Sequence, residues 1–177
     1  MTDSNKTNGT AVTPENTEPE QPDVARAKLD KVDRAILMQL QQDATWSMER
    51  LAKHVGVSKT AAWNRVQRLH EGGVIKRQVG VLDPYQVGLN ETFFIAIKTN
   101  KHQQSWLQKF DEVIQKEREI VEVYRLAGDT DYLIKVQVKS TRDFDALYKR
   151  IVAEVDLYSV TSSLSMEVMK HETALPI

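Results

Sequence analysis

The sequence of 177 residues contains no cysteine. It can therefore form no disulfide bond, hold no thiolate-bound zinc and use no cysteine nucleophile. It also lacks a phosphate-binding glycine loop and the Gly-x-Ser-x-Gly turn of serine hydrolases. The four histidines do not follow the spacing of metal ligands and lie at His54, His70, His102 and His171. We therefore expect no catalytic residue, no metal and no cofactor, and the sequence argues against an enzyme.

Long apolar segments are also missing. No run of about eighteen apolar residues occurs, so the sequence predicts no membrane-spanning helix. The first residues are polar and acidic, unlike a secretory signal. These features favour a soluble, cytoplasmic protein. The length is enough for one ordinary domain or two small ones, each with a modest core.

The formal net charge of −1 conceals an uneven distribution along the chain. Residues 1–24 carry one Lys against five Asp or Glu. Residues 29–82 carry nine Lys or Arg against five acidic residues, and residues 83–177 carry twelve against fifteen. A solvated surface can show such a basic excess in residues 29–82 by chance, but a nucleic-acid-binding face there predicts it.

The N-terminal residues 1–28 are rich in Thr, Asn, Glu and Pro and have few large apolar side chains. Such a segment buries too little surface to offset the entropy lost on ordering, so we predict a disordered acidic tail. An acidic tail can compete with DNA for a basic surface. An inert extension is the simpler interpretation.

A helix-turn-helix is predicted at about residues 48–67, within a DNA-binding domain and linker that cover residues 29–90. Gly56 permits the left-handed backbone that ends a helix, and Ser58 can cap the next one. Asp30 and Ser47 can cap two further helices, which gives a three-helix core. A generic helical hairpin is the alternative. Residues 74–82 alternate loosely and predict a β-wing or a linker strand, so this domain is expected to be winged.

In the second half, residues 91–177, the spacing of apolar residues changes. Alternating apolar residues predict strands at 92–99, 120–126, 132–138 and 160–168. Helical spacing predicts helices at 105–116 and after a cap at Ser140 or Thr141. The order βαββαβ is that of a ferredoxin-like fold, so the chain belongs to the α+β class. Because its helices cover one face of the sheet, the other face is expected to pair with a second copy.

On the second helix of the motif, an inward stripe of Ala62 and Val66 leaves polar residues on the opposite side. These polar residues are Thr60, Asn64 and Gln67. Since they lie toward the N-terminus of the helix, they are expected to reach the edges of the DNA bases. Phosphate contacts are expected from Lys59, Arg68, Lys76 and Arg77. Ser58, at the start of the helix, is also expected at the DNA-binding surface.

Two residues on the flank of the same helix each allow two interpretations. Arg65 can bind a phosphate or pair with an acidic side chain inside the domain. Trp63 can pack on the DNA backbone, although covering the edge of the first helix is the favoured interpretation.

The loop Gly128-Asp129-Thr130-Asp131 joins two predicted strands and is made of turn-forming residues, so a hairpin turn explains it. Its carboxylates can also hold an α-ammonium group while loop amides hold an α-carboxylate.

The whole arrangement resembles the leucine-responsive/asparagine-responsive (feast/famine) family of transcriptional regulators. The resemblance covers residues 29–177 and rests on Leu29-Asp30-Lys31-Val32-Asp33, Leu51-Ala52 with Gly56-Val57-Ser58, Arg65-Val66-Gln67-Arg68-Leu69, Gly73-Val74-Ile75, Leu82-Asp83-Pro84 with Gly88, and Gly128-Asp129-Thr130-Asp131-Tyr132. It implies a regulator that binds double-stranded DNA at roughly palindromic sites. It also implies dimers that assemble further, commonly to octamers.

The resemblance implies an amino-acid effector site formed between dimers, with Gly128, Asp129, Asp131 and Tyr132 on one side. The opposing wall would come from Thr161, Ser162 and Ser163 of a neighbouring subunit. Features of the C-terminal half are similar to regulators of branched-chain amino-acid catabolism and of cysteine detoxification, so cysteine or a branched-chain amino acid is the expected effector. Many members enter the recognition helix with a Pro-Thr-Pro-Cys-like sequence, and this chain has Lys59-Thr60-Ala61-Ala62. No operator sequence can therefore be transferred. A DNA-bending architectural protein without a ligand is the alternative function.

Overall fold

The structure is a computed structural model of the chain and describes residues 27–101 and 103–177. The predicted disordered tail lies outside the described residues, apart from its last two positions. The chain forms two compact units. The first comprises the described residues up to Arg77 together with Pro176–Ile177, and the second comprises Gln78–Leu175.

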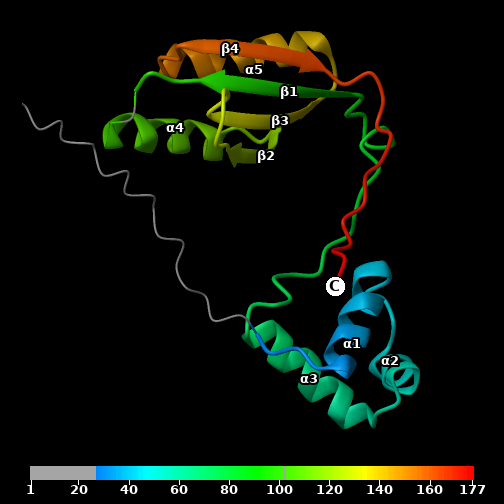
Figure 1. Cartoon of the computed structure of the whole chain (residues 1–177). Helices are drawn as coiled ribbons and strands as arrows, with labels where there is room; N and C mark the ends of the chain where they lie inside the picture. Colours follow the sequence, from blue (N-terminus) through cyan, green and yellow to red (C-terminus); the bar gives the residue numbers. More distant parts are fainter. Residues whose placement is uncertain (1–26, 102) are drawn as a thin grey trace, which may run out of the picture. The chain divides into compact units, whose positions relative to one another are not determined.

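The first unit is the predicted three-helix domain, with α1 at Lys31–Gln42, α2 at Met48–Val55 and α3 at Lys59–Glu71 (Figure 1). All three predicted caps are confirmed. The Asp30 side chain accepts from a backbone amide at the start of α1, Ser47 does so for α2, and Ser58 does so for α3. These bonds satisfy amides that have no partner within the helix.

The core of this unit is small and comes from all three helices. Its buried apolar side chains are Ile36, Leu37, Leu51, Val66 and Leu69. Gly56 ends α2 with φ of 73°, the left-handed backbone that the sequence predicts. The tight turn lets α3 begin only three residues later and pack across α2.

The predicted β-wing is wrong. Residues 74–82 form no strand, and the segment up to residue 90 contains only a short turn. A strand needs a neighbour to complete its backbone hydrogen bonds, and no strand pairs with this segment in the described chain. Its apolar side chains are consequently exposed and include Val79, Val81, Leu82 and Tyr85.

The second unit has the predicted βαββαβ order. Its elements are β1 Glu91–Lys98, α4 Gln104–Lys116, β2 Ile120–Arg125, β3 Tyr132–Val138, α5 Thr141–Glu154 and β4 Ser159–Leu164. The strands lie in the order β2-β3-β1-β4, and every neighbouring pair is antiparallel (Figure 1). This is the ferredoxin-like arrangement.

Alternation along β3 separates two faces of the sheet. The side chains of Tyr132, Ile134, Val136 and Val138 are buried against α4 and α5, while the residues between them are half-buried. On the open face, Phe94 and Tyr124 are exposed. The sheet therefore has one covered face and one face with exposed aromatic side chains.

The last strand is shorter than predicted. β4 ends at Leu164, and the Ser165 amide makes the final hydrogen bond to the Thr92 carbonyl oxygen. Because β1 begins at Glu91, the chain beyond has no strand to pair with. Met166 and Val168, which we predicted to continue the strand, are exposed coil residues.

We predict that Gly56→Ala destabilises the three-helix unit by about 1 kcal/mol, because a side chain disfavours the left-handed backbone. No atom lies within 4 Å of the position that the new Cβ would take, so the effect comes from the backbone alone. Urea unfolding followed by circular dichroism measures it. Gly80→Ala is the control, since that glycine also faces open space and lacks a positive φ. Equal stability of the two variants would contradict the prediction.

Candidate DNA-binding and effector sites

The exposed side of α3 carries the residues that we predicted to read bases. Thr60 and Asn64 are exposed near the N-terminus of the helix, and Gln67 is half-buried one turn further on. The first turn of α3 has no acidic residue. Its free amides and helix dipole therefore favour an approaching anion.

The residues predicted to contact phosphates differ in their surroundings. Lys59 is exposed in the first turn of α3, and Lys76 and Arg77 are exposed in the segment that follows the helix. The Ser58 hydroxyl accepts from the Ala61 amide as the helix cap. Its established role is thus to start the helix.

A buried carboxylate joins α1 to α3. Asp33 is only 1% exposed, and its oxygens accept from the Arg65 guanidinium at 2.7 Å and from the Arg68 guanidinium at 2.6 and 2.7 Å. Arg65 also donates to Asp30 at 2.6 Å. Arg65 therefore makes the internal ion pair that was one of its two expected roles. Sequence reasoning did not identify Asp33 as the partner.

The Arg68 guanidinium donates to both Asp33 oxygens while its side chain stays 59% exposed, so the phosphate contact remains a prediction. The hydrogen bonds among these charged groups also shift pKa values. The amide of Asp33 and the guanidinium of Arg65 lower the pKa of Asp30, and hydrogen bonds to Asp30 and Asp33 raise the pKa of Arg65. The charged forms of Asp30 and Arg65 are therefore stabilised together.

Trp63 does not cover the edge of the first helix as favoured above. Its side chain is 52% exposed on α3, one position before Asn64. A large aromatic surface therefore lies beside the predicted base-reading residues.

The loop between β2 and β3 is held firmly at one end. The Asp131 carboxylate accepts from the Thr99 amide at 2.7 Å, and the Asp131 amide donates to the Ile97 carbonyl oxygen. Gly128 has φ of 150°. Asp129 is exposed, and its carboxylate makes no hydrogen bond within the described structure. The two aspartates of the loop thus differ: Asp131 anchors it and Asp129 is available.

The remaining predicted effector residues do not share one wall. Tyr132 is 8% exposed and packs against Phe110 with ring centroids 4.7 Å apart. On β4, Thr161 and Ser163 pair with Ala96 and Phe94 of the open face. Ser162 pairs with buried Ile95, so alternation directs it to the opposite side.

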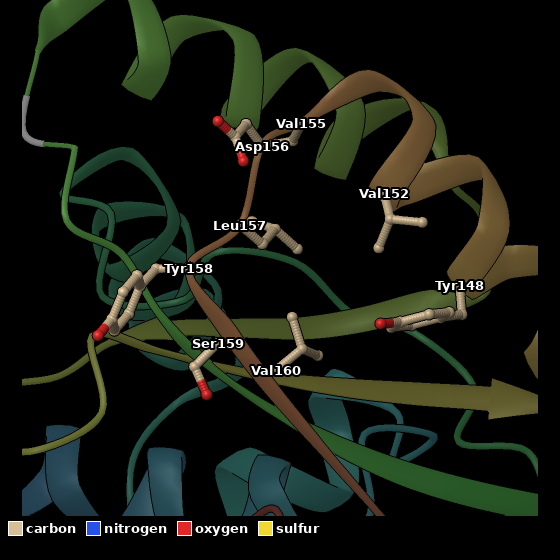
Figure 2. Close-up of a pocket in the computed structure, with 8 residues that line it drawn as sticks. All are labelled: Tyr148, Val152, Val155, Asp156, Leu157, Tyr158, Ser159 and Val160. Atoms are coloured by element: carbon tan, nitrogen blue, oxygen red, sulfur yellow. The ribbon is translucent and has the colours of Figure 1, made fainter.

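Two cavities lie at opposite edges of the sheet. One, of about 340 Å³, lies between α5 and the chain entering β4, and Figure 2 shows its lining residues. Asp156 there pairs with Lys101, and its carbonyl oxygen accepts from the Trp106 indole. The other cavity, of about 370 Å³, lies between α4 and β2 and is lined by Leu107, Phe110, Asp111, Ile114, Gln115, Val123, Arg125 and Tyr132.

A helix-turn-helix with a basic, exposed recognition helix, followed by a separate ferredoxin-like unit, defines the class of DNA-binding regulators with a distinct sensing domain. The AsnC-type helix-turn-helix domain matches residues 29–70, and the Lrp/AsnC ligand binding domain matches residues 92–175. The chain belongs to the Lrp/AsnC family of transcriptional regulators. It is a DNA-binding regulator with a ligand-binding domain.

Known relatives agree with this assignment. The glutamate uptake regulatory protein of Zymomonas mobilis is 45% identical over 150 residues, which cover 85% of this chain and 92% of the relative. The DNA-binding transcriptional activator DecR of Escherichia coli is 43% identical, with coverage of 84% and 99%. A transcriptional regulator of Neisseria meningitidis, solved in complex with L-Met, is 25% identical with a TM-score of 0.80 and coverage of 84% and 97%. No helix among the described residues is long and apolar enough to cross a membrane.

We predict that Asp33→Asn lowers the free energy of unfolding of the three-helix unit by roughly 1.5–3 kcal/mol, because charged hydrogen bonds to two guanidinium groups are lost. Urea unfolding of the full chain, followed by helical circular dichroism, measures the change. Glu71→Gln is the matched control, since it removes one exposed negative charge from the same unit. If Asp33→Asn behaved like this control, the ion-pair network would contribute nothing to stability.

Proposed function

We propose that this regulator reads its operator with Thr60 and Asn64 of α3, with Gln67 at the margin. The observation that carries the proposal is the exposure of the first two at the helix end that enters the major groove in this motif. Asn pairs well with adenine, and Thr can contact a thymine methyl group. Lys59, Lys76 and Arg77 would then position the protein on phosphates without reading sequence.

The proposed effector is a small α-amino acid. The Neisseria relative was solved with L-Met, and the Zymomonas relative is named for glutamate uptake. Cysteine and branched-chain amino acids are also candidates from the sequence. In the loop between β2 and β3, exposed Asp129 can accept from an α-ammonium group, whereas Asp131 already accepts from Thr99. Thr161 and Ser163 remain candidates for a wall contributed by a second subunit.

We also propose that the regulator acts as a homodimer that assembles further, up to an octamer. Exposed Phe94 and Tyr124 leave apolar surface on the open face of the sheet, and a second copy can bury it. Two recognition helices would then meet a roughly palindromic site. The protein would work in the cytoplasm as a regulator, without catalysis and without a nucleoid-type bending role.

Residues that read bases and residues that contact phosphates should respond differently to substitution. Asn64→Ala should lose roughly 1–3 kcal/mol of binding free energy on the specific operator and little on random DNA. Lys59→Ala is the contrasting variant and should weaken binding to both DNAs, with a log–log salt slope reduced by about one per lost contact. Fluorescence anisotropy at several salt concentrations measures both. Equal losses for Asn64→Ala on the two DNAs would remove it from base reading.

The effector loop makes a second prediction. Asp129→Ala should raise the amino-acid concentration for half-maximal response roughly ten- to hundredfold, because a charge-assisted hydrogen bond is lost. The measurement is DNA mobility against amino-acid concentration. Thermal stability and DNA affinity without ligand should be unchanged. Glu112→Ala, an exposed carboxylate on α4, should leave the response unaltered. An unaltered half-maximal concentration for Asp129→Ala would place the ammonium contact elsewhere.

A further inference from the structure

The recognition helix α3 carries an exposed tryptophan. Trp63 is 52% exposed, and it makes no hydrogen bond, ring contact or cation–π contact with any described residue. The other two tryptophans of the chain are engaged. The Arg50 guanidinium lies 3.8 Å from the centroid of the Trp46 ring, and the Trp106 indole donates to the Asp156 carbonyl oxygen at 2.9 Å. Because a large aromatic surface gains free energy when it leaves water, Trp63 is available to a partner.

Helical spacing places Trp63 on one flank of α3. The buried side chains of this helix are Ala62, Val66 and Leu69. Residues three or four apart share a side of a helix, so Trp63 lies beside Lys59, Thr60 and Gln67. The indole therefore stands at the margin between the buried stripe and the residues proposed to read bases.

The other flank of α3 is tied to α1. Arg65 and Arg68 follow Trp63 by two and five residues, which is about half a turn away from it around the helix. Both guanidinium groups donate to the Asp33 carboxylate of α1. The ion pairs between α1 and α3 thus lie on one flank, and Trp63 lies on the other.

A helix in the major groove directs its outward side toward base edges, so its flanks face the deoxyribose and phosphate groups that form the groove walls. An indole suits such a wall, because its ring can pack on sugar carbons while its Nε1–H donates to a phosphate oxygen. The charges around Trp63 favour the same partner. Lys59 is exposed on the same flank, and the first turn of α3 has no acidic residue. This flank is therefore complementary to a polyanion.

We propose that Trp63 packs on the deoxyribose–phosphate wall of the major groove and donates its indole N–H to a phosphate, next to the phosphate held by Lys59. This contact rests on the entry of α3 into the groove that is proposed above. It strengthens binding to any duplex and reads no base. Because the indole is neutral, the contact releases no counterion.

Salt-dependent DNA binding tests this contact. The probes are a labelled duplex of random sequence and an operator selected by the unaltered protein. Trp63→Ala should weaken binding to both by the same factor, roughly tenfold, and leave the log–log salt slope unchanged. Lys59→Ala should instead reduce that slope by about one. Met38→Ala is the matched control, since Met38 is an apolar side chain of α1 with 51% exposure, and it should bind like the unaltered protein.

Tryptophan fluorescence gives a second measurement, which a merely structural role would not alter. Packing on the groove wall shields the indole from water, so random duplex should change the emission of the unaltered protein. Trp63→Phe should lose that change. Trp106→Phe, which alters a tryptophan of the sheet unit, should retain it. Urea unfolding of Trp63→Ala should match that of the unaltered protein, because an exposed side chain adds little to the core.

The outcomes separate this contact from base reading. A loss confined to the operator would mean that Trp63 reads a base, and an altered sedimentation coefficient with unaltered DNA affinity would mean that it joins protein copies. Either result overturns the backbone contact. If Trp63→Ala binds like Met38→Ala while Asn64→Ala still loses affinity for the operator, the Trp63 contact is wrong and the proposed base reading stands. If the unaltered protein binds neither duplex, both proposals are wrong.

Discussion

The placement of the recognition helix depends on one buried carboxylate. Asp33 on α1 accepts from Arg65 and Arg68 of α3, which are spaced so that both guanidinium groups reach the same side chain. A buried carboxylate without such partners would be strongly unfavourable, so α3 is held in the rotation that supplies them. That rotation turns Thr60 and Asn64 outward. The ion pair and the buried side chains of Ala62, Val66 and Leu69 together fix which side of α3 faces outward.

Polar contacts matter here because the helical unit is small. Five buried apolar residues form its central cluster, compared with fourteen in the sheet unit. A domain of this size buries a smaller fraction of its surface and gains less from the hydrophobic effect. Helix caps and the Asp33 network therefore make a larger relative contribution. Arg65 and Arg68 both belong to this network, although the Arg68 side chain remains 59% exposed.

Local signals in the sequence were sufficient for most of the fold. The caps at Asp30, Ser47 and Ser58 and the turn at Gly56 depend on neighbours within a few residues, and all were predicted correctly. Alternation along β3 likewise determined its buried face. The wing failed because a strand depends on a distant pairing partner, which loose alternation in residues 74–82 cannot supply. The pairing of Arg68 with Asp33 was not predicted for the same reason, because the two residues are 35 positions apart in the sequence.

Three aspartates show why residue type alone does not define a site. Asp33 is buried and satisfied by two arginines, Asp131 is fixed by the Thr99 amide, and Asp129 is exposed and unpaired. All three belong to segments that resemble the family, yet of the three only Asp129 has a carboxylate without a hydrogen bond to the described residues. Tyr132 shows the converse, because a residue expected at the effector site begins β3 and packs in the core against Phe110. Burial and hydrogen-bond satisfaction therefore separate structural polar groups from those that can bind ligand.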